Sequence, residues 1–264
     1  MDKAVNESFV QKSVLLGEPI ERYGLKFQGI KMSKYEEWAN CKKVWLSRQS
    51  TFPVFCIMSP FLEAIFKLDM DAIERTGKPA GLLYTIMYCM GLALGMGSDC
   101  VHEERIKIAA NPETHEFHGI LVSTSSNDTV LITPQQFKSI REIVAWQNGE
   151  ELPDETLNDD LLETERILAK QNAPDLKYSL LDLEAAVALN CGQRIKDVMD
   201  WPILEFETIR RTIDRGKRFV INGIGVTNGC KWEGGNPYPS WCFDKEEKTS
   251  RALIAQSQFG KGKK

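Results

Sequence analysis

The sequence has few of the residues from which enzyme active sites are built. Its 264 residues include only three histidines, and no serine lies in the G-x-S-x-G pattern of a nucleophile elbow. No phosphate-binding P-loop pattern occurs. The formal net charge is −4, so the chain lacks the overall positive field that draws proteins to nucleic acid. We therefore expect a protein that is not an enzyme, uses no cofactor and does not bind nucleic acid.

The cysteines also lack the arrangement of a disulfide framework or a zinc knuckle. There are seven of them, an odd number, and none forms a C-x-x-C pair. The first 19 residues carry charges where a signal peptide would need an apolar segment. These features predict a reducing cytoplasm and mostly buried thiols.

Long hydrophobic runs are scarce, and Pro79 to Ser98 is the one stretch with the length of a membrane span. This stretch has no charged residue, and Gly91 and Gly95 have the spacing of a membrane-helix contact. Its several glycines and tyrosines dilute the hydrophobicity, and no basic cluster flanks it. A buried helix in a protein without membrane segments is the prediction.

Hydrophobic periodicity predicts an α+β fold that is predominantly α-helical with a small antiparallel β-meander. No element is expected in the polar residues 1–14. The predicted elements are one or two strands in 18–32, a helix from about Lys34 capped by Ser33, a helix after Ser59-Pro60, a helix over Gly81–Leu94, the meander over Arg105–Thr133, and a helix from Thr133-Pro134 to Asn148-Gly149.

The domain organisation predicted from composition has three parts. Residues 1–149 form a helical subdomain with the small sheet, 150–222 an acidic linker and a helical corner, and 223–264 an irregular segment rich in Gly, Pro and aromatics. The linker carries eight acidic residues and no basic one between positions 150 and 165. We expect it to be solvated and to run into a helix near Asp159; magnesium binding or docking to a basic partner are the alternatives.

One group of side chains has the chemistry of zinc ligands, namely Cys100, His102, His115 and His118. However, His115 and His118 are three positions apart in a predicted strand, and such positions face opposite sides. We expect surface histidines and no metal. A metal-dependent nucleic-acid-processing enzyme is the alternative if the four side chains converge.

The glycines Gly223, Gly225 and Gly229 resemble a nucleotide-binding pattern only superficially. The dinucleotide fingerprint joins a strand to a helix, whereas a predicted helix precedes these glycines. A nucleotide site is not expected here.

The stretch from Leu180 to Asn222 predicts two helices that meet at a corner. Gly192 suits the positive φ of a helix end, Asp200 an N-cap, and Pro202 a first helical turn. In the second helix an apolar face on Phe206, Ile209 and Ile213 lies beside a set of arginines that are candidates for partner binding: Arg210, Arg211, Arg215 and Arg218.

Two alternatives remain open for these surfaces. The arginines either dock a partner or pair internally with the acidic run near Asp159. Tyr238 and Trp241, in the aromatic C-terminal segment, either add to a contact surface or pack back and cover the domain.

The corner resembles a pattern found in tailed-bacteriophage tail assembly chaperones. The matching residues are Val187-Ala188-Leu189, Gly192, and the run from Asp197 to Phe206; the element from Leu25 to Leu46 is also similar to proteins of phage and prophage tail modules. The resemblance implies a chaperone that holds the long tape-measure protein soluble in the host bacterial cytoplasm while tail tube subunits assemble around it. A structural virion protein, such as a head–tail connector, is the other possibility.

Overall fold

The computed structural model describes residues 6–97, 99–111, 114, 116–124, 128–156, 164, 167–168 and 179–228. The chain divides into two compact units. The first contains the residues up to Glu155 together with Lys196–Glu207, and the second contains Thr156–Ile195 and the residues from Thr208 onward. Each unit is described by itself.

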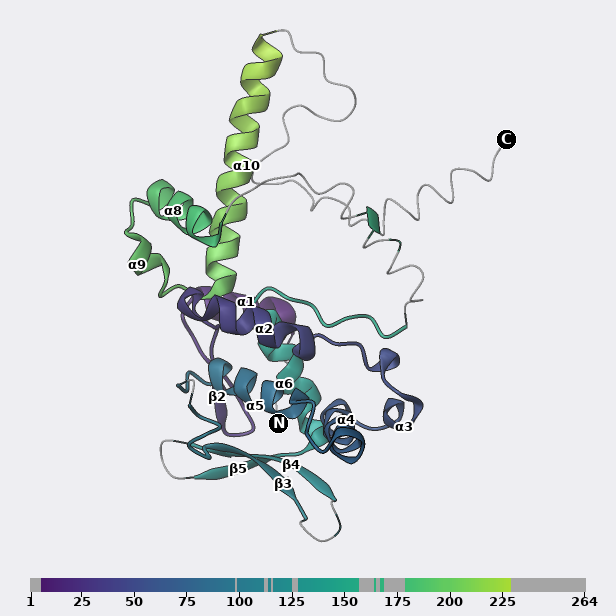
Figure 1. Cartoon of the computed structure of the whole chain (residues 1–264). Coiled ribbons are helices and arrows are strands. Elements are labelled where there is room, and N and C mark those ends of the chain that lie inside the picture. Colours follow the sequence, from purple (N-terminus) through teal and green to yellow (C-terminus); the bar gives the residue numbers. More distant parts are fainter. Residues whose placement is uncertain are drawn as a thin grey trace, which may run out of the picture. The chain divides into compact units, whose positions relative to one another are not determined.

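The first unit contains most of the helices and both sheets (Figure 1). Its elements are α1 (Glu7–Leu15), β1 (Ile20–Arg22), β2 (Leu25–Phe27), the 3₁₀ turn η1 (Met32–Lys34), α2 (Tyr35–Trp45), the 3₁₀ turn η2 (Gln49–Thr51), α3 (Val54–Ile57), α4 (Phe61–Thr76), α5 (Leu82–Ala93), β3 (Ile106–Ala110), β4 (Phe117–Ser123), β5 (Thr129–Ile132) and α6 (Pro134–Gln147). The predicted α+β class, mostly helical with an antiparallel meander, is confirmed.

The two sheets are antiparallel and separate from one another. β1 and β2 form a hairpin whose turn residues, Tyr23 and Gly24, have φ of 52° and 75°, as a type I′ turn requires. The other sheet has the order β3-β4-β5, with Ile106 opposite Val122 and Ile120 opposite Ile132. These four side chains are buried on one face, so the meander covers the helices with an apolar layer.

Helices α2, α4 and α6 meet around a group of aromatic rings. Trp45 lies edge-on to Phe137 at a centroid distance of 5.3 Å, and Phe61 stacks on Phe137 at 6.3 Å. The Arg141 guanidinium lies 3.6 Å from the centroid of the Phe61 ring. Its Nε and Nη2 donate to the carbonyl oxygens of Trp45 and Ser47 at 2.7 and 2.6 Å.

Arg141 keeps its charge although it is buried. Burial lowers its pKa from 12.5 to about 10, and the nearby carboxylate of Glu155 opposes this shift. Glu155 in turn accepts hydrogen bonds from the backbone N–H groups of Gln49 and Ser50, which caps the 3₁₀ turn η2. The arginine therefore connects the end of α2 to the aromatic core by two hydrogen bonds and one ring contact.

The uncharged helix predicted between Gly81 and Leu94 is α5, and eight of its residues are buried. No helix in the described part of the chain combines the length and hydrophobicity needed to span a membrane. The N-terminus of α5 has no local side-chain cap, because Gly81 precedes it. Asp69 of α4 supplies the cap instead, accepting from the N–H groups of Leu82 and Leu83 at 3.1 and 2.8 Å.

Two local predictions were wrong at the N-terminal end. Residues 7–15, expected to lack structure, form α1, where the Asn6 side chain caps the helix and Val10 and Val14 are buried. Ser33 does not cap the next helix; it lies inside η1, and α2 begins after Lys34 without a side-chain cap.

Asp69 should contribute to stability through the two amides that it caps. Asp69→Ala leaves these N–H groups without their acceptor, and we expect a loss of about 1–3 kcal/mol in the free energy of unfolding. Urea denaturation followed by circular dichroism measures this loss. Asp71→Ala on the same helix is the matched control, because Asp71 only pairs with Arg75 on the surface and should cost about 0.5 kcal/mol or less. Equal losses in the two variants would contradict the role of Asp69.

Candidate docking surface

The segment before α10 (Ile203–Thr227) is fixed to the chain around residue 31 by backbone hydrogen bonds. The N–H groups of Met32 and Ser33 donate to the carbonyls of Trp201 and Met199, each at 2.9 Å. The Ile203 N–H donates to the Ile30 carbonyl at 2.8 Å. The second helix of the predicted corner, α10, therefore begins from a fixed position within the first unit.

Asp200 does not have the capping role predicted for it. Its carboxylate lies 3.0 Å from the ammonium of Lys31, where it forms an exposed ion pair. The first helical hydrogen bond instead runs from the Phe206 N–H to the Pro202 carbonyl at 3.0 Å. Pro202 thus occupies the N-cap position, where its missing N–H has no cost.

Phe206, predicted as a partner-binding residue, is part of the core. Only 1% of its surface is exposed, and Val198 and Ile203 near it in sequence are buried as well. A side chain this deeply buried is not available to a partner, so Phe206 is removed from the candidate surface.

The other side of the corner is formed by α8 (Leu180–Cys191) and the short α9 (Ile195–Val198). Ser179 and Asp182 form a capping box, and the hydrogen bonds from Ser179 lower the pKa of Asp182. Gly192 ends α8 with φ of 64°, as its position in the sequence predicted.

Helix α10 is longer than the sequence indicated. It continues through Asn222 to Thr227, so Gly223 and Gly225 are helical and the prediction that an irregular segment starts at residue 223 is wrong. The arginines consequently lie in the middle of the helix. Their charges therefore lie away from the C-terminal end, where cations interact favourably with the helix dipole.

The regular helix also separates the arginines from the apolar residues. At about 100° per residue, Arg211, Arg215 and Arg218 lie within an arc of about 60°. The predicted apolar face on Phe206, Ile209 and Ile213, and with it Val220 and Ile224, lies on the opposite side. The prediction that these arginines lie beside the apolar face is wrong. Of the predicted arginines, Arg210 is nearest that face; it is half-buried and pairs with Asp214 at 3.2 Å.

Two different surfaces of α10 are thus open to solvent in the second unit. Arg211, Arg215 and Arg218 are exposed, and we call them the arginine face. Val220, Ile221 and Ile224 have 57, 65 and 58% of their surface exposed, and we call them the apolar face. Three large apolar side chains exposed within five positions of one helix are typical of a contact surface.

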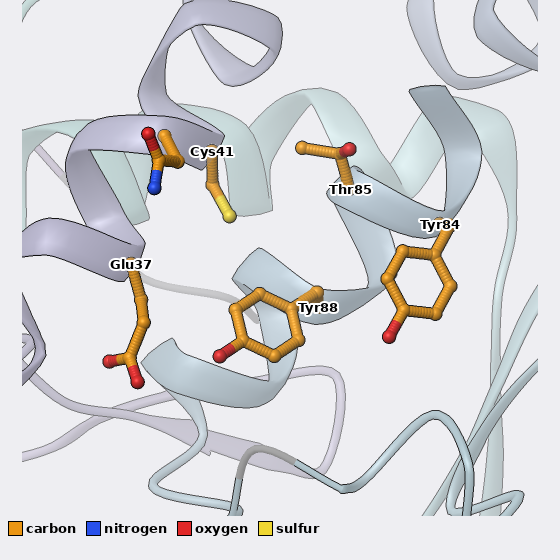
Figure 2. A pocket seen from close by; sticks show the side chains of 6 residues that line it. Glu37, Cys41, Tyr84, Thr85 and Tyr88 are labelled. Atoms are coloured by element: carbon orange, nitrogen blue, oxygen red, sulfur yellow. The ribbon is translucent and has the colours of Figure 1, made fainter. Parts of the chain in front are cut away.

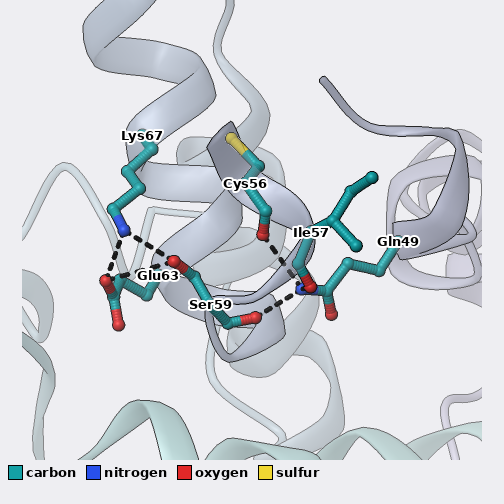
Figure 3. Close-up of polar contacts among 6 residues, drawn as sticks. All are labelled: Gln49, Cys56, Ile57, Ser59, Glu63 and Lys67. Carbon is teal, nitrogen blue, oxygen red and sulfur yellow. Dashed lines mark hydrogen bonds and ion pairs between the residues drawn. The ribbon is translucent and has the colours of Figure 1, made fainter. Parts of the chain in front are cut away.

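A second apolar surface, which the sequence did not indicate, surrounds α3 in the first unit. Val54, Phe55 and Met58 are 85, 50 and 93% exposed. Gln49 fixes the turn that carries them, because its Nε2 donates to the carbonyls of Cys56, Ile57 and Ser59 (Figure 3). Within the apolar run V-F-C-I-M only Cys56 is buried, and the fold rather than the sequence shows this.

Three of the four candidate metal ligands, Cys100, His102 and His118, lie within the described residues. Cys100 is buried, and burial raises its pKa, so it is a neutral thiol at pH 7. The Nε2 of His102 lies 3.2 Å from the Tyr84 hydroxyl, and His118 is exposed on β4. Within the described part of the chain no three His, Cys, Asp or Glu side chains form a metal cluster. His115 lies outside that part.

Several other predicted residues also fall outside the described residues. They are Gly229, Tyr238, Trp241 and, within the acidic run, Asp159, Asp160, Glu163 and Glu165. The predicted helix from Asp159 to Lys170 falls there for the most part.

Comparison with known proteins gives no relative. No protein-family model matches the chain, and neither a curated protein nor a solved structure matches it significantly. Functional inference therefore depends on the surfaces described above and on the resemblance in the helical corner.

The contrast between Phe206 and the exposed end of α10 can be measured. Phe206→Ala should lower the free energy of unfolding by about 3–5 kcal/mol, because it empties a buried site. Ile221→Ala on the same helix should change it by about 0.5 kcal/mol or less, since Ile221 is exposed. Chemical denaturation of both variants gives the comparison. If the Phe206→Ala protein were as stable as the wild type, Phe206 would not be part of the core.

Proposed function

We propose that this protein is a tail assembly chaperone of a tailed bacteriophage, which binds the tape-measure protein during tail morphogenesis in the host cytoplasm. The observation that carries the proposal is the pair of exposed faces on α10, the helix that leads out of the stretch resembling such chaperones, which ends at Phe206. A long partner helix with an apolar stripe would be kept soluble by covering that stripe.

The apolar face is the source of affinity in this proposal. Val220, Ile221 and Ile224 lie within about 100° of arc, which is the width of the stripe that an amphipathic helix buries against another helix. Burying three such side chains contributes several kcal/mol before the cost of association, at about 1.5–3 kcal/mol each.

The arginine face has a different role in the same complex. Its charges lie on the side of α10 opposite Val220 and Ile224, so they contact a second segment of the partner or steer its approach. Arginine suits this role because its planar guanidinium pairs with carboxylates through two hydrogen bonds. Tail tube subunits are further candidates for this surface.

Co-purification with the tape-measure protein of the same phage tests the arginine face. Arg211→Glu with Arg215→Glu should abolish co-purification and leave the melting temperature nearly unchanged, because both side chains are exposed. In the unmutated complex, binding should weaken as salt increases. Lys107→Glu with Lys138→Glu is the matched control, since it makes the same change in net charge at exposed sites elsewhere.

The apolar face is tested in the same assay with Val220→Gln and Ile224→Gln, which keep good helix formers in the helix. This variant should lose the partner at every salt concentration. Normal yield of the partner with both pairs of substitutions would contradict the docking role of α10. Detection of the protein in purified virions by mass spectrometry would contradict the chaperone function, favouring a structural virion component.

A further inference from the structure

An open cavity of about 290 Å³ lies between α2 and α5 in the first unit (Figure 2). Each helix contributes three side chains to its walls, and on each helix these side chains lie about one turn apart. The lining residues are Glu37, Asn40 and Cys41 from α2 and Tyr84, Thr85 and Tyr88 from α5. One carboxylate and two phenol rings are thus gathered in a cavity whose lining includes no cationic side chain.

The two tyrosines form an aromatic wall. Their rings are nearly parallel, with an interplanar angle of 14° and a centroid distance of 6.4 Å, and in Figure 2 the Tyr88 ring lies between Glu37 and Tyr84. The contact of the Tyr84 hydroxyl with His102 at 3.2 Å holds the outer ring in place. Aromatic faces carry partial negative charge and attract cations.

One carboxylate oxygen of Glu37 accepts no hydrogen bond. Its Oε1 pairs with the ammonium of Lys34 at 2.8 Å, whereas its Oε2 is buried and has no hydrogen-bond partner. A carboxylate oxygen without a donor is costly, and because Glu37 lines the cavity, a ligand that brings a donor to this carboxylate is favoured.

The other titratable groups of the cavity stay neutral. Burial and the neighbouring Glu37 raise the pKa of Cys41 to about 11, and the same causes raise the pKa of Tyr88. At pH 7 the thiol and the phenol are therefore protonated, and Glu37 supplies the only formal charge among the lining residues.

We propose that this cavity binds one organic cation, an alkylammonium or guanidinium group, with its charge on Glu37 and its alkyl chain or plane against the rings of Tyr84 and Tyr88. Asn40 and Thr85 supply further hydrogen-bonding groups at the rim. The volume is at the lower end for small-molecule sites and fits a group the size of one lysine or arginine side chain. This site is separate from the faces of α10, and the proposal does not depend on the function proposed for them.

The same chemistry is offered by a lysine or arginine side chain of a protein and by a free amine. Titration of the ¹⁵N-labelled protein with N-acetyl-lysine-N-methylamide, N-acetyl-arginine-N-methylamide and butylammonium separates these sources. The neutral N-acetyl-norleucine-N-methylamide is the control ligand. We expect saturable shifts of the amide signals of Cys41, Tyr84 and Tyr88 with at least one cation and none with the neutral compound.

Variants locate the charge that binds. Glu37→Gln should weaken binding of the cation about tenfold or more, the loss expected for a charge-assisted hydrogen bond. Glu36→Gln is the matched control, because this neighbour is exposed and does not line the cavity. Tyr84→Leu, at an exposed position, should also weaken binding and serves if Glu37→Gln fails to fold.

The outcomes separate cleanly. Binding of the capped amino acids alone assigns the cavity to a side chain of a protein partner, and binding of butylammonium alone assigns it to a free amine; both support the site. Absence of shifts with every cation, equal shifts with the norleucine compound, or unchanged affinity in both Glu37→Gln and Tyr84→Leu would overturn it.

Discussion

The hydrogen bonds between residues 30–33 and 199–203 are the constraint on which the architecture of this chain depends. They join backbone groups that are about 170 positions apart. Beside them the side chains of Lys31 and Asp200 form an ion pair at a separation of 169 positions. Buried backbone groups need partners, and here each segment satisfies the other. Closing so large a loop is entropically costly, so the apolar contacts beside it must contribute.

Those contacts explain the positions of several small and apolar residues. A Cβ added to Gly29 would lie 3.0 Å from both Pro202 and Val14, so only glycine leaves room for the returning chain. Val198, just before the crossing, is buried, as are Ile203 at its end and Phe206 after it. The start of α10 is thereby fixed in the first unit, while its exposed faces belong to the second. A helix that is anchored at one end and carries exposed side chains along its remainder is well suited to present a docking surface.

Local signals in the sequence, such as helix caps and alternating apolar residues, predicted the ends of two helices and the antiparallel meander. Thr133-Pro134 predicted the start of α6, and a capping box with Gln136 is present there; Gly192 predicted the end of α8. The meander followed from its alternating residues and turns. Contacts between residues far apart in the sequence could not be predicted from local signals. Asp69 caps a helix 13 positions away, and Asp200 pairs with Lys31 instead of capping its own helix.

In the candidate sites, too, residue types could be recognised from the sequence but their spatial neighbours could not. The arginines were recognised by type, but the assumption that they lie beside the apolar face failed because it ignored the helical rotation between Arg211 and Ile213. The burial of Phe206 depends on the chain crossing at residue 30, which no local pattern reveals. The cavity between α2 and α5 combines residues more than forty positions apart, and the sequence gives no sign that Glu37 and Tyr88 are neighbours.

Hydrogen exchange at the crossing tests this account most directly. The amides of Met32, Ser33 and Ile203 donate across it, so they should exchange as slowly as the core amides of α6, such as Ile140 and Val144. Exchange of these three amides at the rate of an open chain, while α6 stays protected, would show that the two segments are not joined. The anchored position of α10 would then be wrong.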